Sequence, residues 1–284
     1  MESEVDSLAI IIESGTLKEK RDAISRLKEC EDRSKAFDLL ISCLINESFY
    51  IRGDAASEIS SFTEFQGAVL PLIEALADEE IWVLRNAAST IGYFKDERAV
   101  EPLILLLNHN DGTVNHSARN SLVQIGGRRV IEFALNDLES EQPSQDSILI
   151  LGDLREKKAT KLLIQRLGQM CWSSAYSLSK IGGDVAAKAL ERSLHNALIY
   201  GSTPEYKVSV IKALTRLEYE ESIETIIKAM KVKNEDVRVW AACALGKIGG
   251  ERSEEILLRA KKDKSQRVRD AAIRAINGEF PYLG

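Results

Sequence analysis

The chain has 284 residues, of which 44% are hydrophobic and 29% charged, and its formal net charge is −6. This apolar content suffices for a core and excludes a disordered chain, while 5 prolines and 6% aromatic residues favour helices over a β-sandwich. No apolar run approaches the ~18 residues of a membrane span, and the acidic start MESEVDSLAIII is unlike a signal peptide, so we expect an intracellular, cytoplasmic protein.

A single helical pattern recurs nine times along the chain. Each copy has an apolar reference residue, and the clearest copies add Val or Ile eight residues before it and Ala four before it. This spacing places the side chains on one stripe of an α-helix. The copies lie about 31 residues apart, and so steady a period indicates a repeat protein. The reference residues are, in chain order, Ile24, Ile59, Ile91, Leu122, Leu151, Leu178, Leu214, Leu245 and Ile276.

Each copy is expected to contain a second helix after the first. Gly-Gly pairs follow three of the first helices, at 126–127, 182–183 and 249–250. Glycine adopts the left-handed backbone that closes a helix. The near-duplicate runs 68–76 and 99–107 predict second helices, with Pro71 and Pro102 early in them, where proline is tolerated. The alanines let helices of adjacent copies approach closely, so a stack buries what one pair cannot.

The motif V-R-x-x-A-A-x-x-L-G-x-I-G, spelled by residues 237–249, resembles the HEAT-like repeats of the phycobilisome-lyase type. The resemblance implies an all-α fold, a right-handed α-α superhelix of about nine helical-hairpin repeats. We expect one solenoid over residues 1–284. The polar stretch 139–146 and the long interval around 195–206 are the places where we expect bends or insertions.

Deoxyhypusine hydroxylase is one enzyme that this array resembles, and it implies His-Glu dyads that ligate two irons. The pairs standing at the matching positions are Gly53-Asp54, Arg85-Asn86, His116-Ser117, Trp172-Ser173, Val239-Trp240 and Asp270-Ala271. Only His116 matches the histidine of a dyad, and no acidic residue follows it. Because an iron pair needs several more ligands, we expect neither this activity nor a metal.

Bilin lyases are the other enzymatic branch of the resemblance. A tetrapyrrole groove would need aromatic walls and cations for the propionates, and Trp82, Trp172 and Trp240 have Arg85, Arg238 and Arg269 close in sequence. A tryptophan at a repeat junction is more often a packing residue. We therefore keep a bilin-lyase-like enzyme or cofactor-binding subunit as the alternative, and favour a non-enzymatic protein without a cofactor.

The favoured interpretation is a scaffold whose concave surface binds a protein or peptide partner, because stacked hairpins present one set of side chains per repeat. The candidate binding residues open the first helices of the copies: Arg85, Asn86, Asn115, His116, Trp172, Trp240 and Asp270. The resemblance motivates this choice, because the hydroxylase branch places its ligands at these positions.

Charge is unevenly distributed between the two halves of the chain. Residues 1–140 hold 14 Lys and Arg against 25 Asp and Glu, whereas residues 141–284 hold 24 against 19. Such asymmetry could support head-to-tail self-association. The overall acidity argues against a nucleic-acid partner. The four cysteines match no zinc module, so we expect reduced, structural thiols.

Overall fold

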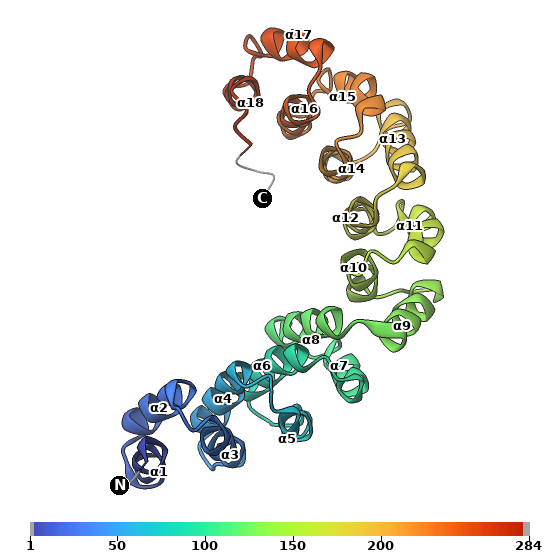
Figure 1. The fold of residues 1–284 in the computed structure, drawn as a ribbon. Helices are drawn as coiled ribbons and strands as arrows, with labels where there is room; N and C mark the ends of the chain where they lie inside the picture. The colour runs from blue at the N-terminus through green and yellow to red at the C-terminus, as the bar shows by residue number, and fades with distance from the viewer. Residues whose placement is uncertain (1–2, 281–284) are drawn as a thin grey trace. The chain divides into compact units, whose positions relative to one another are not determined.

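The computed structural model describes residues 3–280, and within them the chain forms eighteen α-helices and no β-strand. Contacts divide the chain into two compact units, Met1–Phe133 and Ala134–Gly284, and the boundary falls inside helix α9 (Gly127–Glu139). Each unit is built of helical hairpins in two layers, one of odd-numbered and one of even-numbered helices (Figure 1). The expected all-α, hairpin-repeat class is therefore confirmed.

The first unit contains four hairpins. Their helices are α1 (Glu4–Ser14), α2 (Leu17–Arg26), α3 (Arg33–Cys43), α4 (Phe49–Glu58), α5 (Val69–Ala75), α6 (Ile81–Ile91), α7 (Val100–Leu106) and α8 (Gly112–Ile125). Each odd helix packs against the even helix that follows it, and the even helices pack in the order α2, α4, α6, α8. The even layer thus runs through this unit without interruption.

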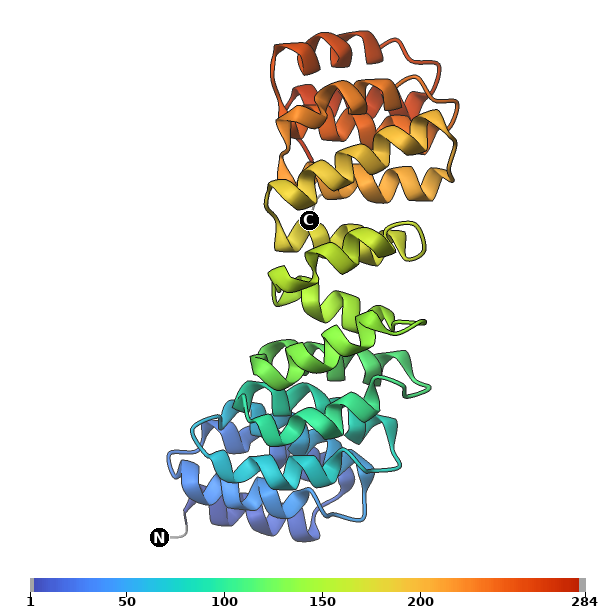
Figure 2. The same cartoon turned by 90° about the vertical axis from the view of Figure 1, so that its right-hand side faces the viewer.

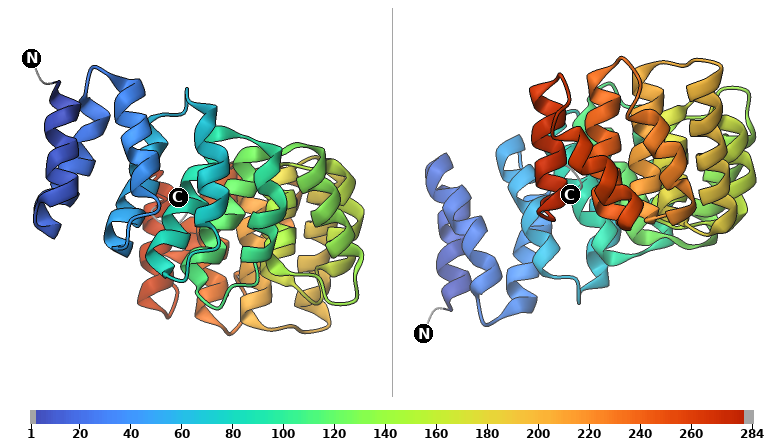
Figure 3. Two further views of the ribbon diagram at one scale, coloured as in Figure 1. Left: turned by 90° about the horizontal axis from the view of Figure 1, so that it is seen from below. Right: turned by 90° about the horizontal axis from the view of Figure 1, so that it is seen from above.

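The second unit continues the pattern after α9. Its helices are α10 (Gln145–Asp153), α11 (Thr160–Arg166), α12 (Cys171–Ile181), α13 (Asp184–Ile199), α14 (Pro204–Leu217), α15 (Ile223–Ala229), α16 (Glu235–Ile248), α17 (Glu251–Ala260) and α18 (Gln266–Ile276). The even helices α10 to α18 pack in sequence. They line the inner side of the curve that this unit makes, and the odd helices line its outer side (Figure 1). Successive helices lie side by side in antiparallel pairs (Figure 2; Figure 3).

The nine even-numbered helices are the nine copies found in the sequence. Every reference residue from Ile24 to Leu245 is fully buried, at 0% exposure, in or just after its helix. Ile276, in the last copy, is 42% exposed, because α18 has no further even helix among the described residues to cover it. The apolar stripe is thus the buried seam between adjacent even helices.

The helix boundaries agree with the expected turn chemistry. All six residues of the Gly-Gly pairs have positive φ, for example 81° at Gly249 and 91° at Gly250. Pro71 and Pro102 lie in the first turns of α5 and α7. Both polar interruptions contain helix starts: the Ser144 side chain caps α10, and the Thr203 side chain caps α14, whose first residue is proline.

Adjacent even helices approach closely at a glycine that directly follows the reference residue. A Cβ atom on Gly152 of α10 would lie 2.6 Å from the Cα of Ser177 in α12. A Cβ atom on Gly246 of α16 would lie 2.5 Å from the Cβ of Ala275 in α18. Ser177 Oγ also donates a hydrogen bond to the carbonyl of Ile148 at 2.8 Å. The glycines therefore set the distance at which repeats stack.

We expect Gly152→Ala to destabilise the second unit by about 1–3 kcal/mol, because the added methyl group must push two helix backbones apart. Gly168→Ala is the matched control, since nothing lies within 4 Å of its Cβ position. Chemical denaturation of both variants compares the two free energies of unfolding. An equal stability of the two variants would contradict the close-approach argument.

Candidate interaction face

In the first unit, the expected binding residues on α6 are engaged within the protein. The guanidinium of Arg85 lies over the Trp82 ring, 4.7 Å from its centroid. Asn86 Nδ2 donates to the carbonyl of Gly53 in α4 at 3.0 Å. A Cβ on Gly53 would overlap the Trp82 ring, so Trp82 packs directly on the backbone of the preceding even helix. Asn86 and Trp82 therefore join two repeats.

The expected residues on α8 divide into one structural and one exposed side chain. Asn115 Nδ2 donates to the carbonyl of Leu107 at 2.6 Å, and its Oδ1 is buried without a hydrogen-bond partner. His116 is exposed, with its Nδ1 3.0 Å from the Nη2 of Arg119. Of these two, His116 is the residue that solvent and a partner can reach.

In the second unit, the structure brings two of the three expected residues together. Trp240 and Asp270 line one small cavity of 160 Å³ between α16 and α18, together with Arg267 and Arg274. Asp270 is exposed and accepts a hydrogen bond from Gln266. Trp172, at the start of α12, is 50% exposed and is not part of that cavity.

Arg238, which stands two residues before Trp240, is a buried bracing residue. Its side chain is 4% exposed, and its Nε and Nη2 each donate to the Asp263 carboxylate at 3.0 Å. Its Nη1 donates to the carbonyls of Val232 and Lys233. Burial raises the pKa of Asp263, but the hydrogen bonds from Arg238 and from the Ser265 amide outweigh burial and hold it below the usual value. Arg238 is thus unavailable to a ligand.

Arg52 makes the same kind of brace in the first unit. It donates to Asp78 at 2.6 and 2.9 Å, and to the carbonyls of Asn46 and Glu47. Arg52 and Arg238 both stand seven residues before their reference residues, and each reaches the loop before the next even helix. The two braces therefore tie successive repeats.

A row of basic side chains crosses the even helices of the second unit, and we call it the cationic strip. Its members are Lys180, Lys212, Arg216, Lys247 and Arg274. Cation–π contacts connect neighbouring members. The Tyr176 ring lies 5.4 Å from Lys180 Nζ and 4.9 Å from the Arg216 guanidinium, so it joins α12 to α14. Lys212 Nζ lies 4.1 Å from the centroid of the Trp240 ring, which joins α14 to α16.

The cationic strip was not among the residues expected from the sequence. Lys180, Arg216 and Lys247 each stand two residues after a reference residue, in three consecutive copies. That shared offset was the signal that could have identified them. In the first unit the same offset carries Arg26, Ser61, Tyr93 and Gln124. A basic row is thus a property of the second unit.

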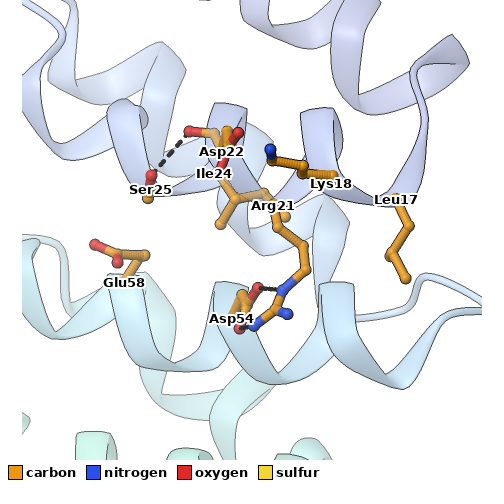
Figure 4. A pocket seen from close by; sticks show the side chains of 8 residues that line it. All are labelled: Leu17, Lys18, Arg21, Asp22, Ile24, Ser25, Asp54 and Glu58. Atoms are coloured by element: carbon orange, nitrogen blue, oxygen red, sulfur yellow. Dashed lines mark hydrogen bonds and ion pairs between the residues drawn. The ribbon is translucent and has the colours of Figure 1, made fainter.

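A pocket of 590 Å³ lies at the start of the first unit, between α2 and α4 (Figure 4). Two of the charged groups that line it form an ion pair: Arg21 Nε donates to Asp54 Oδ2 at 2.5 Å. Ser25 Oγ donates to the backbone carbonyl of Asp22 rather than to a base (Figure 4). The pocket therefore lacks the nucleophile and base pairing that hydrolytic chemistry needs.

The remaining chemically reactive groups are the potential metal ligands and the cysteine thiols. Between residues 3 and 280, no three His, Cys, Asp or Glu side chains come together in a way that could hold a metal ion. The four cysteines are unpaired, and burial raises the pKa of the Cys43 and Cys171 thiols to about 11. Thiols with so high a pKa are weak nucleophiles at neutral pH. None of the helices in the described part combines the length and apolarity needed to cross a bilayer.

Several solved structures align with most of this chain, and the likeness of fold rests on importin beta. Importin beta aligns with a TM-score of 0.56 and 13% identity, covering 99% of this chain and 50% of its own. Human deoxyhypusine hydroxylase aligns with a TM-score of 0.38 and 17% identity, covering 96% of this chain and 95% of its own. The CpcE and CpcF complex of phycocyanin lyase from Nostoc aligns with a TM-score of 0.37 and 20% identity, covering 98% of this chain and 94% of its own. At these identities the likeness concerns the fold alone.

The family comparison is more specific. No curated protein sequence matches this chain closely enough to count as a relative. The family model for HEAT repeats matches residues 69–145 and 191–277, which together make up more than half of the chain. These ranges include five of the nine copies, and the other copies have the same helical hairpins. The chain therefore belongs to the family of HEAT-repeat proteins.

Proposed function

We propose that this protein is a non-enzymatic scaffold that binds a protein or peptide partner along the inner, even-numbered helices of its second unit. The observation that carries the proposal is the cationic strip. It places half-buried Lys180 on α12 and exposed basic side chains on α14, α16 and α18 in one row. A row with one or two side chains per repeat suits an extended macromolecular partner better than a compact small molecule.

The remaining features of the chain are consistent with a binding role. Some polar side chains join adjacent repeats, as the hydrogen bonds of Asn86 and Arg238 illustrate. His116 is exposed beside Arg119 rather than beside a carboxylate. Trp172, Trp240 and Asp270 lie on the even helices of the second unit and remain candidates for the partner's contacts.

Cross-linking of a complex isolated from the native host tests the location of the partner. A lysine-reactive cross-linker should join the partner to Lys212 and Lys247 on the even helices. The control sites are Lys161 of α11 and Lys188 of α13, exposed lysines on the odd helices of the same unit. Cross-links confined to the odd helices would reject the proposed face. Links between two copies of this chain would instead support the predicted head-to-tail association.

The bilin-lyase-like alternative has a separate readout. A cofactor-binding subunit purified from its host should show a visible chromophore spectrum. A scaffold should be colourless, and elemental analysis should find no stoichiometric iron. A bound pigment would replace the scaffold proposal by the alternative while leaving the repeat fold unchanged.

A further inference from the structure

We infer that the partner segment is an acidic, extended peptide, whose carboxylates pair with the cationic strip. The inference rests on the proposed function, because it assumes that the even helices of the second unit are the binding face. It adds the chemical class of the partner and the side chains that recognise it.

The cations of the strip are placed regularly along successive even helices. Lys180, Arg216 and Lys247 occupy one offset in consecutive repeats, so they lie on the same side of α12, α14 and α16. Lys212 stands four residues before Arg216 on α14 and therefore shares its helix face. Arg274 on α18 borders the same cavity as Trp240. The strip thus repeats its positive charge from helix to helix.

Neighbouring aromatic rings hold three of the cations in place. Tyr176 has Lys180 and Arg216 near its ring, and Trp240 has Lys212 over its ring. These cation–π contacts hold the charged groups in place without using their N–H donors. Arg216 Nη1 donates to Ser179 Oγ at 3.1 Å, and its other N–H groups make no further hydrogen bond within the described residues. A single-stranded nucleic acid would require open ring faces for stacking. Because cations already lie at these rings, the face favours carboxylates over nucleotides.

The acidic side chains that pair with the strip are easily replaced by carboxylates of a partner. Asp153 pairs with Lys180 at 3.4 Å, and Glu218 pairs with Lys247 at 2.9 Å. Both pairs are partly exposed, and exposed ion pairs contribute little to stability. The exposed Asp270 lies in the same cavity as Arg274, so five cations face three carboxylates and positive charge remains in excess. A partner carboxylate can therefore replace Asp153 or Glu218 at small cost.

The size of the strip defines a suitable peptide. Packed helices lie about 8–10 Å apart, so the three steps from α12 to α18 span about 25–30 Å. An extended chain advances about 3.3 Å per residue, which corresponds to roughly three residues per repeat. A peptide with Glu at every third position should therefore place successive carboxylates near successive cations.

The test uses a fluorescein-labelled peptide of about twelve residues, with Glu at every third position and Ser between. Fluorescence anisotropy measures its affinity for the full-length protein. The inner variant, Lys180→Glu/Arg216→Glu/Lys247→Glu, should bind at least about tenfold more weakly because close like charges repel the ligand. The outer variant, Lys158→Glu/Lys161→Glu/Lys188→Glu, has the same change in net charge and should bind within about twofold of the unaltered protein.

Further controls separate the possible outcomes. Circular dichroism shows whether the inner variant folds; if it does not, Lys212→Gln/Arg274→Gln takes its place and should weaken binding by severalfold. Equal losses in the inner and outer variants, or no binding of the Glu peptide, would overturn the inference. So would equal affinity for a Gln-for-Glu peptide or for a single-stranded oligonucleotide of similar length. If cross-links still map to the even helices in that case, the scaffold function stands and only the acidic partner is wrong.

Discussion

Ala87→Glu should lower the melting temperature of the first unit by more than any surface change, because it places a carboxylate in a fully buried seam. Ala87 has 0% exposure on α6, which packs against both α4 and α8. Burial of an unpaired charge costs several kcal/mol, and whole domains are stable by only about 5–15 kcal/mol. Thermal unfolding followed by circular dichroism should show a partly or wholly unfolded variant. Ala241→Glu on α16 is the equivalent change in the second unit.

Ser89→Glu provides a control for this prediction on the same helix. Ser89 is exposed and stands only two residues from Ala87, so the two variants share the added charge and nearly the same helix position. We expect Ser89→Glu to change stability by less than about 0.5 kcal/mol. Similar melting curves for Ala87→Glu and the unaltered protein would contradict the packing of the even helices described above.

Arg238→Met should destabilise the second unit by roughly 3–5 kcal/mol, the cost of removing one partner from a buried ion pair. The variant leaves the Asp263 carboxylate buried without its guanidinium, and it also removes donors from the carbonyls of Val232 and Lys233. Arg267→Met is the matched control. Arg267 is 61% exposed and pairs with Glu235 and Asp236 at the surface, so its loss should cost less than about 1 kcal/mol.

The pH dependence of this variant identifies the ion pair as the cause. The pKa of Asp263 is lowered in the folded protein. Its pairing with Arg238 therefore contributes fully to the free energy of unfolding when the pH is above the unfolded pKa of about 3.9. That contribution is lost as the pH falls through the lower, folded pKa. The stability difference between the unaltered protein and Arg238→Met should therefore narrow in acid. Arg238→Met/Asp263→Asn should be less destabilised than the sum of the single variants. If the stability difference between the unaltered protein and Arg238→Met did not change with pH, the destabilisation would come from lost packing and not from the ion pair.

The repeats could be predicted from the sequence because buried apolar residues recur at a fixed helical spacing. The reference residues mark the even helices, and the Gly-Gly pairs end three of them as expected. Both features are local in sequence: one depends on helical periodicity and the other on backbone conformation. The arrangement as one solenoid over residues 1–284 and its right-handedness stay predictions.

Side-chain partners were harder to predict, because they depend on contacts between repeats. Asn86 was expected to face a partner, yet it bonds to the carbonyl of Gly53, 33 residues away. Arg238 stands beside Trp240 in sequence, but its guanidinium is directed to Asp263 in the following loop. Lys247 resembles an ordinary solvated lysine until Lys180 and Arg216 are found on the same face. Hydrogen bonds and ion pairs between repeats cannot be predicted from the sequence of one helix alone.

The Arg238 brace gives the second unit uneven stiffness. Seven residues before their reference residues, α4 and α16 carry Arg52 and Arg238, whereas α12 and α14 carry Cys171 and Lys207. In a repeat protein, the contacts between two neighbouring repeats determine how easily the junction between them bends. Bending should then concentrate around α12 and α14, beneath the first cations of the strip. The spacing of those cations could adjust to partners whose acidic groups are unevenly placed, while the clamped end at α16 and α18 keeps its register.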